Sequence, residues 1–143
     1  MNWKKLVFGG NNRYSLKTDI GLLLLRVFAG LSMAFAHGMG KVPPSDGFIR
    51  GVGKMGFPLP ELFAWSAGLS EFIGAILIAI GFLSRPSAFF LSITMLVAAL
   101  IKHGGDGFGS QEKPLLYAFV FILIMLAGPG RFSVDGRIRR LGD

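Results

Sequence analysis

The chain has 143 residues, of which 52% are apolar and only 16% are charged, and its mean hydropathy is +0.57. A soluble domain usually carries about 25% charged residues, so these values exclude an ordinary soluble domain and indicate a small helical membrane protein. The formal charge is +7, but the basic residues lie at the ends of apolar stretches, which argues against nucleic-acid binding. Cysteine is absent, so the chain has no disulfide, no thiolate metal site and no thiol chemistry.

A basic segment over residues 1–19 precedes the first apolar stretch, and we predict that it lies in the cytoplasm. Its acidic residue, Asp19, favours a helix start because a carboxylate stabilises the positive end of the helix dipole. The first membrane span is then predicted over about residues 20–38. This span contains Arg26 and His37, which are eleven residues apart, almost three helical turns, and therefore lie on one helix face.

The connection over residues 39–60 is rich in proline and glycine, which break helices. Three of its apolar residues are spaced i, i+4, i+7, namely Phe48, Val52 and Met55. This spacing fits either a short helix in the membrane interface or a packed loop, and the sequence leaves both open.

The second span, predicted over about residues 62–83, carries a single carboxylate, Glu71, near its middle. An unpaired charge at mid-membrane costs at least about 2.5–3.5 kcal/mol, so this acid must be paired, neutralised or functional. Alanine and glycine residues share its helix face and let another helix approach closely. We therefore predict that Glu71 points into a helix bundle and away from lipid.

The last two spans are predicted over about residues 86–101 and 114–127, joined by a flexible glycine-rich loop over residues 104–113. Gly128-Pro129-Gly130 ends the fourth span, and residues 128–143 form a basic tail. Nine Lys and Arg residues lie on the side of the two termini, against five on the opposite side, which predicts cytoplasmic termini. The predicted fold class is all-α: a multi-pass four-helix bundle in the cell inner membrane, with both termini inside.

Depth along the membrane can be estimated by counting about 1.5 Å per residue from the inner end of each span. The count places Glu71 between Arg26 and His37, within reach of an extended arginine, and predicts a structural pair of Arg26 and Glu71 in mid-membrane. This pair is either a buried salt bridge that fixes helix register or part of a polar pocket for a small ligand, such as a quinone head group.

An outer vestibule is predicted where the spans emerge and polar residues reach a level close to that of His37. Its members are His37, Lys41, Lys102, His103, Asp106 and Glu112. Our candidates for ligand binding or proton exchange are therefore Arg26, His37, Lys41, Glu71, His103 and Glu112. No nucleophile–base–acid triad is visible, so no catalytic residue is assigned. A haem between the two histidines and a metal site in the vestibule both lack supporting ligand spacing, and we predict no metal.

Four stretches of the chain resemble the DoxX family of small four-span membrane proteins: residues 22–41, 56–88, 113–117 and 128–138. The matching motif residues are Arg26, His37, Gly38, Lys41, Glu71, Gly74, Gly128, Pro129, Gly130, Ser133 and Asp135. The resemblance covers roughly residues 20–138 and implies a bacterial-type inner-membrane protein with a DoxX-like domain over residues 20–127. Family members have been linked to thiosulfate:quinone oxidoreductase, and to membrane complexes with superoxide dismutase and a sulfurtransferase in oxidative-stress defence. The bundle is also similar to that of thiol-redox membrane enzymes, whose activity cannot be carried over to a chain without cysteine.

The residues and the resemblance together favour an oxidoreductase-associated membrane subunit with a polar intramembrane pocket for a quinone-like or small anionic ligand. In this hypothesis the chain holds no cofactor of its own beyond a quinone. Its partners are the lipid bilayer and either a redox-protein subunit or further copies of the chain, and nucleic acid is not expected. The alternative is a non-enzymatic scaffold or assembly factor for a redox or stress-defence complex, in which the buried polar residues are structural. A small transporter, which four spans allow only as an oligomer, is a third hypothesis.

Overall fold

The computed structural model describes residues 14–141, so Lys4, Lys5 and Arg13 of the predicted basic segment lie outside the described part. Every regular element within residues 14–141 is a helix. Four helical stretches are long and apolar enough to cross a membrane: Leu16–Lys41, Pro60–Ile80, Ser84–Lys102 and Phe108–Ala127. The prediction of an all-α bundle with four membrane-spanning helices is therefore confirmed.

Three of the four spans are built from several helical segments. In chain order the elements are α2 (Leu16–Met33), η1 (Ala34–Gly38), η2 (Met39–Lys41), α3 (Asp46–Lys54), α4 (Pro60–Leu69), η3 (Ser70–Gly74), α5 (Ala75–Ile80), α6 (Ser84–Val97), η4 (Ala98–Lys102), α7 (Phe108–Ala127) and α8 (Val134–Leu141). The segment η2 is a 3₁₀ turn, while η1, η3 and η4 are π-helical turns, whose hydrogen bonds span five residues instead of four. Of the two alternatives for Phe48, Val52 and Met55, the structure has the short helix, α3.

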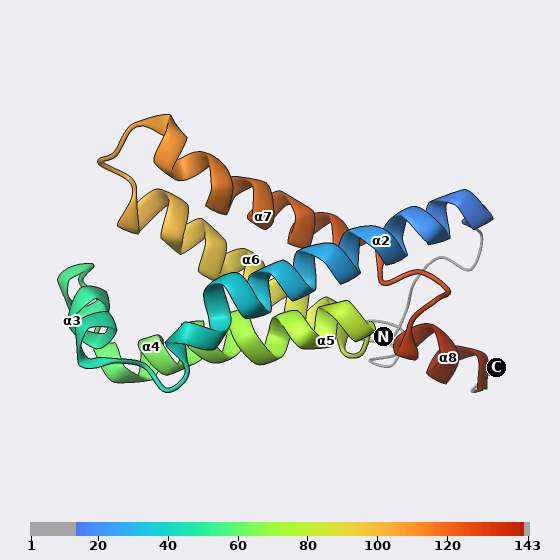
Figure 1. Ribbon diagram of the computed structural model, residues 1–143, viewed down its shortest axis with the longest axis horizontal. Coiled ribbons are helices and arrows are strands. Elements are labelled where there is room, and N and C mark those ends of the chain that lie inside the picture. The colour runs from blue at the N-terminus through green and yellow to red at the C-terminus, as the bar shows by residue number, and fades with distance from the viewer. Residues whose placement is uncertain (1–13, 142–143) are drawn as a thin grey trace.

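The spans form two helix pairs that pack against each other (Figure 1). α2 lies along α5 and α6 lies along α7, while η3 and α5 contact α6 and so join the two pairs. The core between them consists of small and medium-sized apolar side chains: Ala29, Met33, Ala34, Ala75, Ile78, Ala88, Leu91, Met95, Ala118, Phe121 and Ile124. The first and last described residues lie at one end of the bundle, where the hydroxyl of Tyr14 donates to the carbonyl of Ala127. Following the predicted topology, we call this the inner end and the opposite one the outer end.

Two glycines fix how the first span sits against the second. A Cβ at Gly30 would lie 2.6 Å from a backbone oxygen of α5, and one at Gly38 would lie 2.5 Å from the backbone nitrogen of Phe72. Such distances leave no room for a side chain, so the two backbones are in direct contact. The contact places Gly38 at the level of Glu71, and it places Arg26 about 18 Å nearer the inner end.

Arg26 is buried at the inner end, against the left-handed turn at Gly81 that ends the second span. One terminal nitrogen of its guanidinium donates to two carbonyls of α5, and the other donates to the carbonyl of Phe132. The predicted pair of Arg26 and Glu71 is therefore wrong. The depth count assumed that all spans begin at one level, whereas α2 extends past the second span at the inner end (Figure 1).

The predicted basic tail folds back under the bundle and ends in α8. Asp135 is fully buried, and its two carboxylate oxygens accept the backbone N–H groups of Leu83 and Ser84, each at 2.9 Å. These donors open α6 and have no partner within that helix, so a tail residue caps the third span. Asp19 in α2 accepts the backbone N–H of Arg131 at 2.9 Å in the same way. The tail thereby closes the inner end of the bundle.

The first span is longer than the estimate of residues 20–38. It begins at Leu16, because the side chain of Ser15 caps the helix by accepting the N–H of Thr18 at 3.2 Å. It continues through η1 and η2 as far as Lys41. The added turns carry polar side chains, which an apolar count alone leaves out.

The fourth span also begins earlier than predicted. α7 starts at Phe108, so part of the predicted loop over residues 104–113 is helical, and Pro114 lies inside the helix rather than at its start. The side-chain amide of Gln111 anchors this first turn by donating to two carbonyls of the preceding loop, including that of His103 at 3.0 Å. Because α7 starts at Phe108, residues before Pro114 are helical, and Lys113 is one of the helical residues that line the site described below.

Candidate functional site

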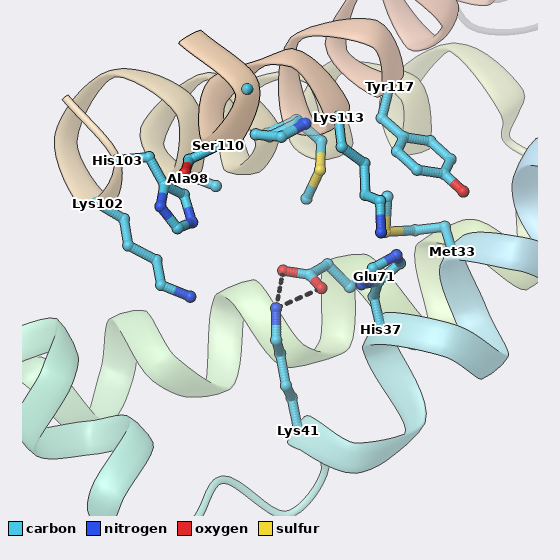
Figure 2. Close-up of a pocket in the computed structure, with 13 residues that line it drawn as sticks. Met33, His37, Lys41, Glu71, Ala98, Lys102, His103, Ser110, Lys113 and Tyr117 are labelled. Atoms are coloured by element: carbon cyan, nitrogen blue, oxygen red, sulfur yellow. Dashed lines mark hydrogen bonds and ion pairs between the residues drawn. The ribbon is translucent and has the colours of Figure 1, made fainter. Parts of the chain in front are cut away.

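A polar cavity of about 310 Å³ opens between the two helix pairs near the outer end of the bundle (Figure 2). One wall comes from η1, η2 and η3, and the opposite wall comes from η4 and the start of α7. Met33 and Met95 from the core also line it. Its polar and charged lining residues are His37, Lys41, Glu71, Lys102, His103, Ser110, Lys113 and Tyr117.

Three of the spans widen into a π-helical turn at the level of this cavity. His37 lies in η1, Glu71 in η3 and Lys102 in η4. A π-turn adds a residue to one helical turn, so the side chains in it depart from the faces expected for 3.6 residues per turn. Such turns occur frequently at functional sites. The three π-turns therefore help to decide which polar side chains face the cavity.

Glu71 is the most deeply buried charged group of the cavity, with 3% of its side chain exposed. The prediction that it faces the bundle interior is confirmed. Both of its carboxylate oxygens accept a hydrogen bond from Nζ of Lys41, each at 2.6 Å. Removing one partner would leave a buried charge uncompensated, so the pair holds until another charged or hydrogen-bonding group replaces the contact.

The opposite wall carries two lysines that have no carboxylate partner. Among the residues that the structure describes, Lys102 and Lys113 take part in no ion pair, and both side chains extend into the cavity (Figure 2). His103 beside them is held by Asp106, whose Oδ2 lies 2.7 Å from the Nδ1 of His103. Because Glu71 already neutralises the cation on the first wall, the cavity keeps an excess of positive charge.

His37 and Tyr117 bring an aromatic contact into the cavity. Their rings meet edge to face with centroids 5.9 Å apart, and Tyr117 stacks on the fully buried Phe121 at 6.0 Å. This stack ties the site to the apolar core. Within residues 14–141 the imidazole of His37 has no hydrogen-bond partner, so its ring nitrogens are available to a ligand.

Four of the six predicted site residues line the cavity: His37, Lys41, Glu71 and His103. Arg26 does not, because it lies at the inner end. Glu112 does not either, because it is exposed on α7 while the next residue, Lys113, takes the cavity side of that helix. The grouping of Glu112 with the outer vestibule is therefore wrong.

Sequence reasoning placed Lys102 in the outer vestibule without naming it as a site candidate, and it missed the lining residues Lys113 and Tyr117. A signal for these two is present, since Lys113 and Tyr117 are spaced i, i+4 and so share one helix face. That signal could be used only if α7 starts before Pro114, as it does. Asp135 was noticed as a motif residue, but its capping role depends on partners 51 and 52 residues away.

The side chains around the cavity suit a ligand group rich in oxygen. Ammonium groups, imidazoles and a phenol can all donate hydrogen bonds to oxygen atoms, and charge-assisted bonds of this kind are the strong ones. Glu71 adds one acceptor that can also exchange a proton. Within residues 14–141, no three His, Asp or Glu side chains lie close enough together to hold a metal ion.

Comparison with protein families shows to which family the chain belongs. The DoxX family profile matches residues 21–104, more than half of its length. The chain belongs to the DoxX family. This membership was predicted from the motifs, and with four spanning helices it makes the chain an integral membrane protein.

Relatives of this DoxX-family chain carry membrane names. It is 33% identical over 125 residues to the inner membrane protein YphA of Escherichia coli (strain K12), covering 81% of this chain and 89% of that protein. It is 31% identical over 124 residues to the inner membrane protein YqjF of the same strain, covering 82% and 91%. An uncharacterised protein of Haemophilus influenzae is 28% identical over 132 residues, covering 87% of each chain. No solved structure matches the chain.

The DoxX profile match covers most, but not all, of the residues that line the cavity. Residues 21–104 include the whole first wall, with His37, Lys41 and Glu71, and they include Lys102 on the second wall. Lys113 on α7 lies beyond the match. The part of the site shared with the DoxX profile is therefore the buried ion pair and its immediate surroundings.

Proposed function

We propose that this DoxX-family protein is an inner-membrane subunit of a redox system, and that its outer cavity binds a small anionic or quinone-like group. The observation that carries the proposal is the buried Glu71–Lys41 pair, which faces lysines without carboxylate partners across an open cavity. Lysines at a membrane interface ordinarily extend toward water. Lys102 and Lys113 are exposed as well, but they also line the same space as a buried carboxylate, which supports a binding role.

Each group of the cavity has a task in this role. Lys102 and Lys113 donate hydrogen bonds to the oxygen atoms of the ligand. A quinone takes up protons as well as electrons when it is reduced, and Glu71 and His37 are the groups that can pass protons on to it. The electrons come from a redox centre on a partner protein. The Lys41 side chain holds the Glu71 carboxylate in place between turnovers.

The inner end of the bundle favours a second candidate, a non-enzymatic scaffold or assembly factor. The buried charges there, Arg26 and Asp135, are bonded to backbone groups of other segments and hold the tail against the spans. Charges used in this way need no ligand. If the Glu71–Lys41 pair has the same kind of role, the chain would organise a redox or stress-defence complex without binding a small molecule.

Mass spectrometry of small molecules extracted from gently purified protein tests the proposal. The samples are wild type, Glu71→Gln, His37→Ala and the control Glu61→Gln, which makes the same substitution at an exposed position outside the cavity. We expect an anion or quinone in wild type and in the control. A quinone should be lost from both cavity variants, whereas an anion should be lost from His37→Ala but retained by Glu71→Gln, because that change frees the Lys41 cation. If no folded sample retains a small molecule and a stoichiometric protein partner co-purifies instead, the scaffold is the correct function.

A further inference from the structure

A long apolar groove of about 800 Å³ lies next to the polar cavity. The groove lies between the second and third spans, and exposed apolar side chains such as Ile73, Phe90 and Ile93 line it, so it faces the hydrocarbon of the bilayer. The cavity and the groove share four residues: Lys41, Glu71, Ala98 and Lys102. A ligand can therefore occupy both spaces at once.

The length of the groove fits a lipid chain. It reaches from Ala98 at the edge of the cavity down to Leu83, fifteen residues along the third span and about 22 Å. One leaflet of a bilayer core is about 15 Å thick. A full-length hydrocarbon chain therefore fits along the groove, and a small soluble ion would leave it empty.

The outer mouth of the groove is covered by α3. Phe48, Val52 and Met55 on the apolar side of this helix line the groove, and α3 packs against α4. Nζ of Lys41 lies 5.5 Å from the ring centroid of Phe48, which places the ion pair directly beside this cover. A ligand chain therefore has its open path from the side, through the bilayer.

The four residues that line both the cavity and the groove, which we call the junction, carry the charge that selects the head group of the ligand. Lys102 lines both spaces and Lys113 lines the cavity, and neither has an ion-pair partner among the described residues. Glu71 is already compensated by Lys41. The uncompensated charge is thus positive, and an ammonium group such as that of Lys102 is matched by an anionic oxygen group such as a phosphate.

We infer that the ligand of the cavity is a membrane lipid with a phosphate head, whose phosphate binds Lys102 while one hydrocarbon chain lies in the groove. Lys102 lines both spaces and has no ion-pair partner within residues 14–141. The inference rests on the proposed function, because it uses the same cavity, and it narrows the ligand from a small anion or a quinone to an acidic long-chain lipid. The lipid enters sideways from the outer leaflet. The Glu71–Lys41 pair then forms the floor under its head group.

Native mass spectrometry of the protein in a neutral detergent tests both the phosphate head group and the hydrocarbon chain of the proposed ligand. The probe is dioleoyl phosphatidic acid, compared with phosphatidylcholine of the same chains, dihexanoyl phosphatidic acid, inorganic phosphate and ubiquinone. We expect the long-chain acid to bind about tenfold or more tightly than the zwitterionic lipid, because one charge-assisted contact is of that strength. The short-chain acid and inorganic phosphate should bind more weakly still, because they leave the groove empty.

Variants assign the binding to this site. Lys102→Gln should weaken binding of the long-chain acid about tenfold, while Lys102→Arg keeps it. Ala98→Phe should block the junction and weaken the long-chain acid but not inorganic phosphate. Lys54→Gln and Ala36→Phe are the matched controls, because both positions are exposed and line neither space. The melting temperature of each variant establishes that it is folded.

The outcomes separate this inference from the proposed function. If inorganic phosphate and the long-chain acid bind equally, with the same loss in Lys102→Gln, the groove is not used and only the small-anion function stands. If ubiquinone binds and the acid does not, the acidic head group is refuted and a quinone function stands. If no probe binds to folded wild type, the inference and the proposed function are both refuted.

Discussion

The contact between the first and second spans predicts that Gly38→Ala is strongly destabilising. A Cβ at this position would lie 2.5 Å from the backbone nitrogen of Phe72, and the backbone of Glu71 is closer still. Both neighbours are backbone atoms inside helical turns, so no side-chain rotation can relieve the clash. The first span must move away from η3, and Glu71 lies at the point of contact.

The size of the effect follows from that distance. Ordinary contact begins at 3.4 Å, so the two backbones must separate by about 1 Å. Overpacking of this kind costs about 1–3 kcal/mol. A chain of this size loses about 2–4 °C in Tm for each kcal/mol, so Tm should fall by roughly 2–12 °C. Lys41 lies three residues beyond Gly38, so the same displacement should loosen its contact with Glu71.

Thermal unfolding of the purified protein in detergent, followed by circular dichroism, measures this effect. Two other glycines of the same span serve as controls, because a Cβ at Gly21 or at Gly40 meets nothing within 4 Å. Gly21→Ala lies inside α2 and should raise stability by about 0.5–1 kcal/mol, since alanine is the better helix former. Gly40→Ala should leave Tm nearly unchanged. If Gly38→Ala is tolerated as well as Gly40→Ala, the register described for the two spans is wrong.

Three further predictions concern the two ends of the bundle. Lys41→Met should lower the free energy of unfolding by about 1–3 kcal/mol, because it leaves the buried Glu71 carboxylate without a partner. The double variant Lys41→Met/Glu71→Gln should recover part of that loss, and strictly additive losses would contradict the pair. Asp135→Ala should lower Tm well below the Tm of Asp46→Ala, a control at an exposed position. A lost helix cap costs about 0.5–2 kcal/mol, and the two N–H donors that Asp135 now accepts would remain buried without a partner. Equal Tm values for the two variants would contradict the capping role. A reporter fused to the C-terminus should be active only in the cytoplasm. The variant Gly105→Cys, in a chain otherwise free of cysteine, should react with an impermeant thiol reagent added outside the cell. The reverse pattern would show that the predicted topology is wrong.

The fold was accessible from the sequence because hydropathy and small residues act locally. Apolar blocks of membrane-spanning length predicted four spans, and the alanines and glycines around Glu71 predicted that it faces the bundle. Both predictions are confirmed. Neither depends on how one span is placed against another along the membrane axis.

The partner of Glu71 was not accessible, because it depends on the relative placement of two spans. A count from span ends gave Arg26, whereas backbone contact at Gly30 and Gly38 puts Lys41 over the carboxylate instead. The start of α7 had a similar effect, since the choice between Glu112 and Lys113 depends on a single helical position of about 100°. Pro114 was taken as the first residue of that helix because proline favours the first helical turn, but it lies inside α7, which begins at Phe108.

The two ends of the bundle use buried charge in different ways, and this difference supports the proposal that the outer end binds the ligand. At the inner end, Arg26 and Asp135 are bonded to backbone carbonyls and N–H groups, which belong to fixed segments and cannot be exchanged. At the outer end, Glu71 is bonded only to the end of a lysine side chain, beside a cavity with further cations that have no ion-pair partner among the described residues. A backbone partner makes a charge part of the scaffold, whereas a side-chain partner at a cavity can be displaced by a ligand. The structural role first considered for the buried charges therefore belongs to the inner end, and the search for a ligand belongs to the outer end.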